Sequence, residues 1–361
     1  MTPNVRYLDG WRGLAILCVF IGHFTYRPAL DWAGEFGVQL FFALSGFLMA
    51  NLLFIKKVEM RDFFARRLSR VVPTFILFVI IMYVYATKFQ TTRYVPPSME
   101  LFATFSFLRT YLPTELSIWS TFWPIGHIWS LNVEEHSYIF LAIGSMLTRR
   151  ARGASLACIF LSGSVLLSIW FCICYAAHPP SGAAPWFIRS ECAALALIAA
   201  AAIRTVRNAV EHPILESVSR LLPVLWVVIA MACISTYKHR GGQHIIAPLC
   251  LALAINYLDK IPGMMKTALS NPVLGWFGKC SFSLYLWQQP FFVAVVSDEL
   301  PKLIGCTLAI ASGAISFYAF ENPVREKLNR KWTTRKKAHP SQDAVPPAGP
   351  VAERHTAVPG A

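Results

Sequence analysis

A series of apolar runs, each about twenty residues long, recurs along the chain from Trp11 to Phe320. A helical run of this length crosses the roughly 30 Å hydrocarbon core of a bilayer. Within lipid, a helix satisfies its own backbone hydrogen bonds. The pattern therefore predicts an all-α, polytopic membrane protein with about ten transmembrane helices, at residues 11–30, 34–55, 71–87, 128–147, 154–176, 186–203, 221–236, 244–258, 274–296 and 303–320.

Composition and charge agree with this class. Hydrophobic residues make up 55% of the 361 residues and charged residues only 14%, which leaves too little charge for a soluble surface. In a soluble protein, a net charge of +14 would suggest that the protein binds nucleic acid. Here, 23 of the 33 Lys and Arg residues lie in segments that share one side of the membrane with the N-terminus. The positive-inside rule thus predicts both termini in the cytoplasm and no nucleic-acid partner.

The sequence divides into one membrane domain, residues 1–327, and a tail, residues 328–361. The tail is basic and then rich in Pro and Ala, which predicts a disordered cytoplasmic segment. The nine cysteines lie in or beside apolar runs and form no CxxC pair. We therefore interpret them as small buried hydrophobes and expect no metal site.

Two polar residues, Arg12 and His23, interrupt the first apolar run. Eleven residues are almost three helical turns, so both side chains lie on nearly one face, about 16 Å apart. A lipid-facing charge costs at least about 2.5 kcal/mol, which favours a functional role. In the alternative, Arg12 reaches the membrane interface and His23 bonds a neighbouring helix.

A second polar cluster is "FFARRLSRVVP", in which Arg67 and Arg70 are three residues apart. On a helix they share a face, and paired guanidinium groups suit phosphate oxygens. The alternative is that these arginines only anchor the cytoplasmic side.

A third cluster is "GHIWSLNVEEHSYIF", residues 126–140, with His127, Glu134, Glu135 and His136 at the predicted outer mouth of a span. His127 and Glu134 are seven residues apart and share a face if this stretch is helical. The alternative is a hydrated interfacial cap. Ser45, within "GVQLFFALSGFLMA", fits close packing between helices equally well.

Taken together and in order, these segments resemble the acyltransferase 3 family of membrane O-acyltransferases. The matching stretches are "YLDGWRGLAILCVFIGHF", "GVQLFFALSGFLM", "RRLSRVVP", "HIWSLNVEEHSYIF", "FSLYLWQQPFF" and "ENPVR", from Tyr7 to Arg325. The family hallmark is a basic residue, ten residues, then His, which Arg12 and His23 satisfy. The chain departs from the family where Gln288 replaces a frequent His and where His136 follows the two Glu residues.

The resemblance implies roles for individual residues. It implies that His23 is catalytic and that Arg67 and Arg70 bind the acyl-CoA donor, acetyl-CoA above all. Arg12, Glu134 and Glu135 are expected to belong to the catalytic region. Four further residues are expected to bind substrate: Asp9, Ser45, His127 and Trp129.

The resulting hypothesis is a multi-pass enzyme of the bacterial inner membrane that works among membrane lipids. It would transfer an acyl group from acyl-CoA to a sugar hydroxyl of a surface polysaccharide, a lipopolysaccharide or a lipo-oligosaccharide. The alternatives are a transporter or flippase of a lipid-linked sugar, an acyltransferase of a secondary metabolite such as a macrolide, and a purely structural membrane subunit.

Overall fold

The computed structural model of the protein describes residues 6–25, 28–89, 94–112, 118–149, 155–182, 184–210, 218–236 and 243–338. These residues form helices and connecting turns, with no β-strand among them. The helices are α1 (Arg6–Phe24), α2 (Trp32–Ala50), α3 (Met60–Val84), α4 (Ser98–Phe105), α5 (Trp129–Arg149), α6 (Ser155–Ala177), α7 (Ser190–Ala193), α8 (Leu195–Ala209), α10 (Leu222–Thr236), α11 (Gln243–Asn256), α12 (Gly263–Leu269), α13 (Pro272–Val296), α14 (Lys302–Ser316) and α15 (Asn322–Ala338).

The described residues of each apolar segment are largely helical, which confirms the all-α class, although segment 186–203 is divided among a 3-10 turn and the helices α7 and α8. Five helical stretches are long and apolar enough to cross a membrane: Trp32–Ile55, Met60–Phe89, Ser155–Ala177, Ser190–Ala209 and Lys302–Trp332. Helices α10 and α11 are apolar but shorter. Helices α1, α5 and α13 are not among the five, and each of them carries polar residues of the candidate site. The expected total of about ten spans stays a prediction.

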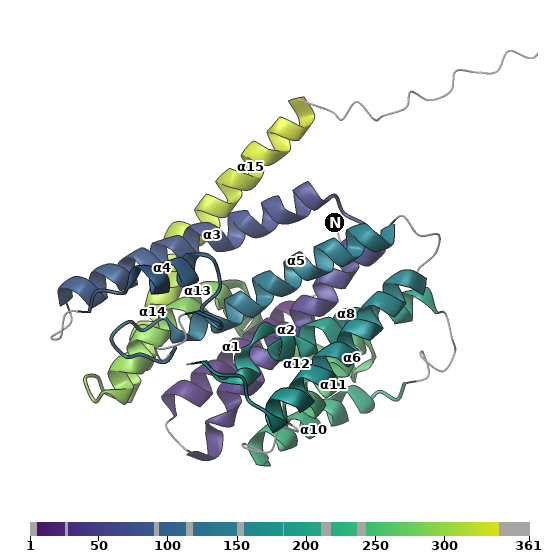
Figure 1. The fold of residues 1–361 in the computed structure, drawn as a ribbon, viewed down its shortest axis with the longest axis horizontal. Coiled ribbons are helices and arrows are strands. Elements are labelled where there is room, and N and C mark those ends of the chain that lie inside the picture. The colour runs from purple at the N-terminus through teal and green to yellow at the C-terminus, as the bar shows by residue number, and fades with distance from the viewer. Residues whose placement is uncertain are drawn as a thin grey trace, which may run out of the picture.

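Helix α1 packs between α2 and α13, and glycines bring the three backbones close together (Figure 1). A side chain at Gly37 of α2 would lie 2.5 Å from the Ala15 carbonyl oxygen of α1. A side chain at Gly278 of α13 would lie 2.0 Å from the Asp9 carbonyl oxygen. Because only glycine permits such approaches, polar residues on the facing sides of these helices are brought within reach of one another.

The remaining helices pack around this group of three. Helix α8 lies on α2, α6 and α11 pack on α8, and α10 packs on α11, while α14 covers α13. Helix α13 has a well-defined start, because the Asn271 side chain accepts a hydrogen bond from the Val273 backbone amide, 2.8 Å away, and Pro272 follows it. Helix α15 runs alongside α3 and then projects beyond the body of the protein (Figure 1).

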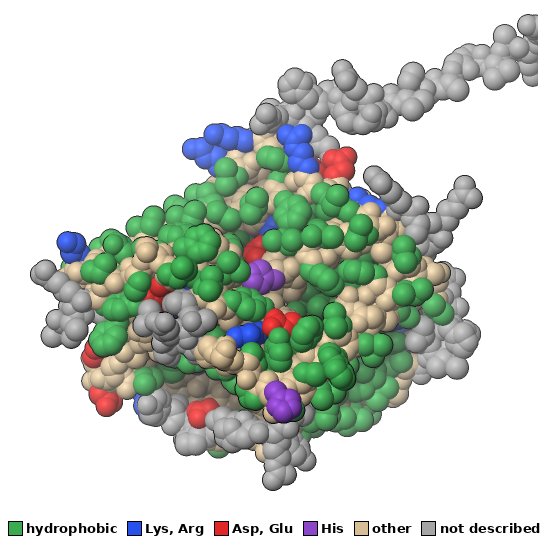
Figure 2. Space-filling model, viewed as in Figure 1, with side chains coloured by type: hydrophobic (Ala, Val, Ile, Leu, Met, Phe, Trp, Pro, Cys, Tyr) green, Lys and Arg blue, Asp and Glu red, His purple; other side chains and the backbone are tan. Residues whose placement is uncertain are grey.

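The outer surface suits contact with lipid. Hydrophobic side chains cover most of the face drawn in Figure 2, and Lys and Arg gather near the end from which α15 projects. Helix α6 is typical, since Ile159, Leu166 and Trp170 are all more than 60% exposed. A surface that exposes so many large apolar side chains is typical of contact with lipid rather than with water alone.

The expected boundary of the tail falls inside a helix. Helix α15 continues to Ala338, so the structure places residues 328–338 in a helix, and the disorder expected of the tail stays a prediction. The stretch "LNRKWTTRKKA" contains no Pro or Gly that would end a helix. Residues 339–361, the Pro- and Ala-rich part of the tail, lie outside the described residues.

The charge pattern leads to a first test. We expect a reporter that is active only outside the cytoplasm to be inactive when it is fused after residue 338, and a cytoplasmic reporter at the same place to be active. The reason is the concentration of Lys and Arg on the predicted cytoplasmic side. Activity of the external reporter at this position would overturn the predicted orientation.

Candidate functional site

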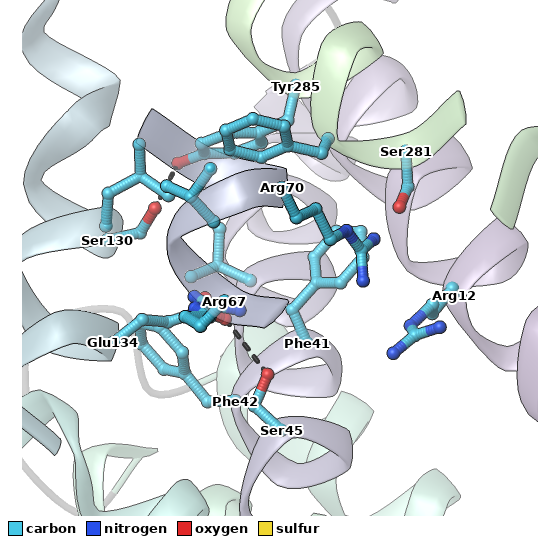
Figure 3. Close-up of a pocket in the computed structure, with 14 residues that line it drawn as sticks. Arg12, Phe41, Phe42, Ser45, Arg67, Arg70, Ser130, Glu134, Ser281 and Tyr285 are labelled. Atoms are coloured by element: carbon cyan, nitrogen blue, oxygen red, sulfur yellow. Dashed lines mark hydrogen bonds and ion pairs between the residues drawn. The ribbon is translucent and has the colours of Figure 1, made fainter. Parts of the chain in front are cut away.

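A cavity lies between α1, α2, α3, α5 and α13 (Figure 3). It is lined by Arg12, Val38, Phe41, Phe42, Ser45, Arg67, Arg70, Val71, Ser130, Leu131, Glu134, Ser281, Phe282 and Tyr285. Five residues singled out in the sequence therefore meet in one space: Arg12, Ser45, Arg67, Arg70 and Glu134. The lining holds three guanidinium groups and one carboxylate, so the cavity favours an anionic occupant.

Within this cavity, Arg67 is held by two carboxylates. Its Nη2 lies 2.6 Å from Glu134 Oε2, and its Nε donates to Glu135 Oε1 at 3.1 Å. Ser45 donates to the other oxygen of Glu134 at 3.0 Å, and the Tyr138 ring lies 4.0 Å from the guanidinium carbon. Both carboxylates and Arg67 are only about 15% exposed. Partly buried charges of this kind need such partners, so Arg67 fastens α3 to α5.

The other two arginines are much less engaged. Arg70 makes no hydrogen bond or ion pair with any residue that the structure describes, and Glu321 offsets its charge only at longer range. Arg12 has one ion pair, to Asp9 at 3.7 Å. Figure 3 shows the guanidinium groups of Arg70 and Arg12 pointing into the same space. These two side chains can therefore offer hydrogen bonds to a bound anion.

His23 lies near the far end of α1, outside the lining of the cavity. Its Nδ1 is 2.7 Å from Gln288 Oε1 of α13. Because an amide oxygen can only accept, this contact favours the neutral tautomer with the proton on Nδ1, in which Nε2 is an acceptor. The ring also stacks on Phe292, with centroids 4.3 Å apart. Two contacts from α13 thus fix the tautomer and orientation of His23.

Matching faces of three helices connect the cavity to His23. On α1 the shared face runs from Arg12 to His23. On α2 it runs from Ser45 in the cavity to Gly34, which lies beside the His23 ring. On α13 it runs over seven residues, from Ser281 in the cavity to Gln288. Spacings of seven and eleven residues return to nearly the same helical face, so each helix presents both the cavity and the surroundings of His23.

Other residues expected from the sequence lie elsewhere. His127 belongs to a 3-10 turn, Gly126–Ile128, that precedes α5. The condition for a face shared with Glu134, an α-helix that includes residue 127, is therefore not met. His127 is 3% exposed, and its carbonyl oxygen accepts from Tyr285 at 2.8 Å. Trp129 packs against Phe42. Neither His127 nor Trp129 lines the cavity, and Asp9 reaches it only through Arg12.

The structure also identifies residues that the sequence did not single out. Ser281 and Tyr285 line the cavity, and their spacing of four residues, followed by Gln288 three residues later, is the signal that could have revealed this face. His136 lies apart from the cavity, and its Nδ1 is 2.7 Å from Ser190 Oγ. The described residues contain no group of three His, Cys, Asp or Glu side chains placed to hold a metal ion.

Comparison with known proteins gives a consistent picture. The peptidoglycan O-acetyltransferase OatA of Listeria monocytogenes is 24% identical over 354 residues, covering 89% of this chain and 56% of OatA. The putative peptidoglycan O-acetyltransferase YrhL of Bacillus subtilis is also 24% identical, covering 92% of this chain and 57% of YrhL. A putative O-acetyltransferase of Staphylococcus aureus is 23% identical, covering 90% of this chain and 58% of that protein.

The chain thus spans a little more than half the length of these relatives. No solved structure matches it. The model of the acyltransferase 3 family, described as an acyltransferase domain, matches residues 5–318. This match covers the cavity, the His23 pair and all the helices that carry them. The chain belongs to the acyltransferase 3 family.

Proposed function

We propose that the protein is a membrane O-acyltransferase that moves an acetyl group from acetyl-CoA to a hydroxyl of a surface glycan. The observation that carries this proposal is that α1, α2 and α13 each place one residue at the cationic cavity and, two or three turns farther along the same face, another residue at His23, whose Nε2 can accept a proton. The cavity suits the phosphates of the donor, and the histidine suits deprotonation of a hydroxyl. The names of the relatives support a glycan acceptor.

In this proposal the donor enters from the cytoplasmic side, with its phosphates against Arg70 and Arg12. Its long arm follows the shared face of α1 toward His23, a distance of about 16 Å along the helix. Arg67 contributes positive charge but is bound to Glu134 and Glu135. This arrangement favours a donor contact through Arg12 and Arg70, in place of the Arg67 and Arg70 fork that the sequence suggests.

The chemistry then needs one base and two aligned substrates. The hydroxyl oxygen of the acceptor attacks the thioester carbonyl carbon, and His23 Nε2 takes the hydroxyl proton. The carbon–sulfur bond breaks as the tetrahedral intermediate collapses, and the CoA thiolate leaves, to be protonated by solvent or by His23. Holding donor and acceptor in line at His23 supplies much of the rate.

The experiment that tests the proposal is release of the CoA thiol by the purified protein, with and without glycan. We expect thiol release to rise with glycan concentration and to match the acetyl groups recovered on the glycan. A flippase of lipid-linked sugars would move its cargo without releasing thiol. Absence of glycan-dependent thiol release across polysaccharide and lipo-oligosaccharide acceptors would contradict the proposal.

A further variant tests the role of Gln288 as a positioning residue. Replacing Gln288 by Leu removes the acceptor that fixes the His23 tautomer. We expect kcat to fall roughly tenfold or more, the size of one lost buried hydrogen bond, with little change in the KM for acetyl-CoA. Gln288→Glu keeps an acceptor oxygen and should recover part of kcat. Equal kcat in all three proteins would show that Gln288 does not position His23.

A further inference from the structure

Gly34 differs from the neighbouring glycines of the same helix. A Cβ atom at Gly37 would lie 2.5 Å from the Ala15 carbonyl oxygen, and one at Gly46 would lie 1.9 Å from the Leu197 carbonyl oxygen. Those two glycines are required for backbone packing. Among the described residues, a Cβ atom at Gly34 would meet only the ring of His23, at 3.7 Å from both Cδ2 and Nε2. The space that a Gly34 side chain would fill is therefore open and bordered by the reactive edge of His23.

The close approach of two backbones keeps Gly34 in this position. A Cβ atom at Gly22 of α1 would lie 2.3 Å from the Gly34 amide nitrogen, so α1 and α2 touch one residue before His23. Gly34 thus faces the His23 ring from α2, while Gln288 holds the opposite nitrogen from α13. The hydrogen bond to Gln288 leaves the Nε2 lone pair available, and the ring edge that holds Nε2 borders the space at Gly34.

The distance of 3.7 Å between the Cβ position at Gly34 and Nε2 can be compared with the geometry that proton transfer requires. A hydroxyl that gives its proton to Nε2 places its oxygen about 2.6–3.2 Å from that nitrogen. The carbon that bears the hydroxyl then lies roughly 3.6 Å from the nitrogen, given ordinary bond lengths and angles. A Cβ atom at Gly34 would lie 3.7 Å from Nε2 and also 3.7 Å from Cδ2, so it would border the Nε2–Cδ2 edge of the ring, beside the lone pair and not on its axis.

We propose that Gly34 is a specificity-determining residue whose missing side chain forms the space for the carbon atom that bears the acceptor hydroxyl. The proposal rests on the function proposed for His23. It predicts different effects on transfer to a sugar and on hydrolysis by water, whereas a general packing role predicts equal effects. Water has no such carbon, so a methyl group at position 34 excludes a sugar hydroxyl more strongly than it excludes water. Acetyl-CoA binding is untouched, because Arg12 lies about three helical turns from His23 along α1 and Arg70 lines the same cavity as Arg12.

The test compares Gly34→Ala with Gly163→Ala, a control on α6 where a Cβ atom has no neighbour within 4 Å. Both changes favour the helix, so thermal unfolding should show both proteins folded. For Gly34→Ala we expect kcat/KM for the glycan to fall at least about tenfold, as one methyl group in a tight pocket can produce. The KM for acetyl-CoA and the slow hydrolysis of acetyl-CoA by water should stay within about twofold of the unmodified protein. Gly163→Ala should match the unmodified protein in all three measurements.

Two further variants complete the design. Gly34→Val should lose more transfer than Gly34→Ala, because it fills more of the space. Gly34→Ser is close in size to Ala and replaces it if the alanine protein accumulates poorly. A folded Gly34→Ala or Gly34→Ser protein that acetylates glycan at the unmodified rate would overturn the proposal. An equal loss of transfer and hydrolysis would also overturn it, since the side chain would then disturb the whole site.

The role of His23 is judged separately, by His23→Ala in the same assays. Loss of both transfer and hydrolysis in His23→Ala supports the proposed function whatever Gly34→Ala does. If His23→Ala keeps both activities, the proposed function of His23 fails, and the inference about Gly34 fails with it.

Discussion

Replacement of His23 by Ala is expected to lower acetyl transfer by about 10²- to 10⁴-fold, the usual contribution of a positioned general base. The structure gives the reason, because Gln288 and Phe292 hold the ring with Nε2 free to accept a proton. The protein should still insert and accumulate, since the ring makes no other side-chain hydrogen bond with the described residues. Transfer is measured with purified protein at saturating acetyl-CoA.

The matched control is His178→Ala, because His178 is exposed and lies outside the site. It should transfer acetyl groups at the unmodified rate. A His23→Ala protein that accumulates normally and keeps near-normal transfer would remove His23 from the mechanism.

The second large effect is expected at the donor end of the path. Arg70→Ala and Arg12→Ala should each raise the KM for acetyl-CoA about tenfold or more, because a charge-assisted hydrogen bond contributes about 1.5–3 kcal/mol. The KM for the glycan should change little. Lysine at either position should restore only part of the affinity, since an ammonium group cannot make the planar, two-pronged contact. Direct binding of acetyl-CoA in detergent, at matched salt, is the measurement.

The control for this experiment is Arg66→Ala, which removes an exposed arginine from the same helix without touching the cavity. Arg67→Ala is expected to behave differently from Arg70→Ala. It leaves Glu134 and Glu135 without their cation, so lower accumulation or lower kcat should dominate over a change in donor affinity. Unchanged acetyl-CoA affinity in both Arg12→Ala and Arg70→Ala would contradict the proposal that the cationic cavity binds acetyl-CoA.

The helices could be predicted from the sequence, because apolar runs of about twenty residues form few structures other than membrane-spanning helices. Helix α3 begins at Met60, so Arg67 and Arg70 do lie on a helix, as their spacing predicts. His127 and Glu134 do not share an α-helical face, because α5 begins only at Trp129, after a 3-10 turn that holds His127. A periodic spacing says nothing about where a helix starts.

The partners within the site were beyond the reach of sequence spacing. The bond between Arg67 and Glu134 joins residues 67 positions apart, and the bond between His23 and Gln288 joins residues 265 apart. Such pairs depend on which helices pack together, and glycine contacts such as that of Gly278 with the Asp9 carbonyl decide this packing. For the same reason Gln288, which departs from the family pattern, gains a positioning role only when α13 is seen beside α1.

The central claim is that donor and acceptor meet across one path, from the cationic cavity to His23. It is tested most directly in proteoliposomes of known orientation, with radiolabelled acetyl-CoA on one side of the membrane and glycan on the other. Label should reach the glycan only when acetyl-CoA is on the side from which α15 projects and glycan is on the opposite side. Transfer that requires both substrates on the same side, or that proceeds equally in either arrangement, would contradict the claim.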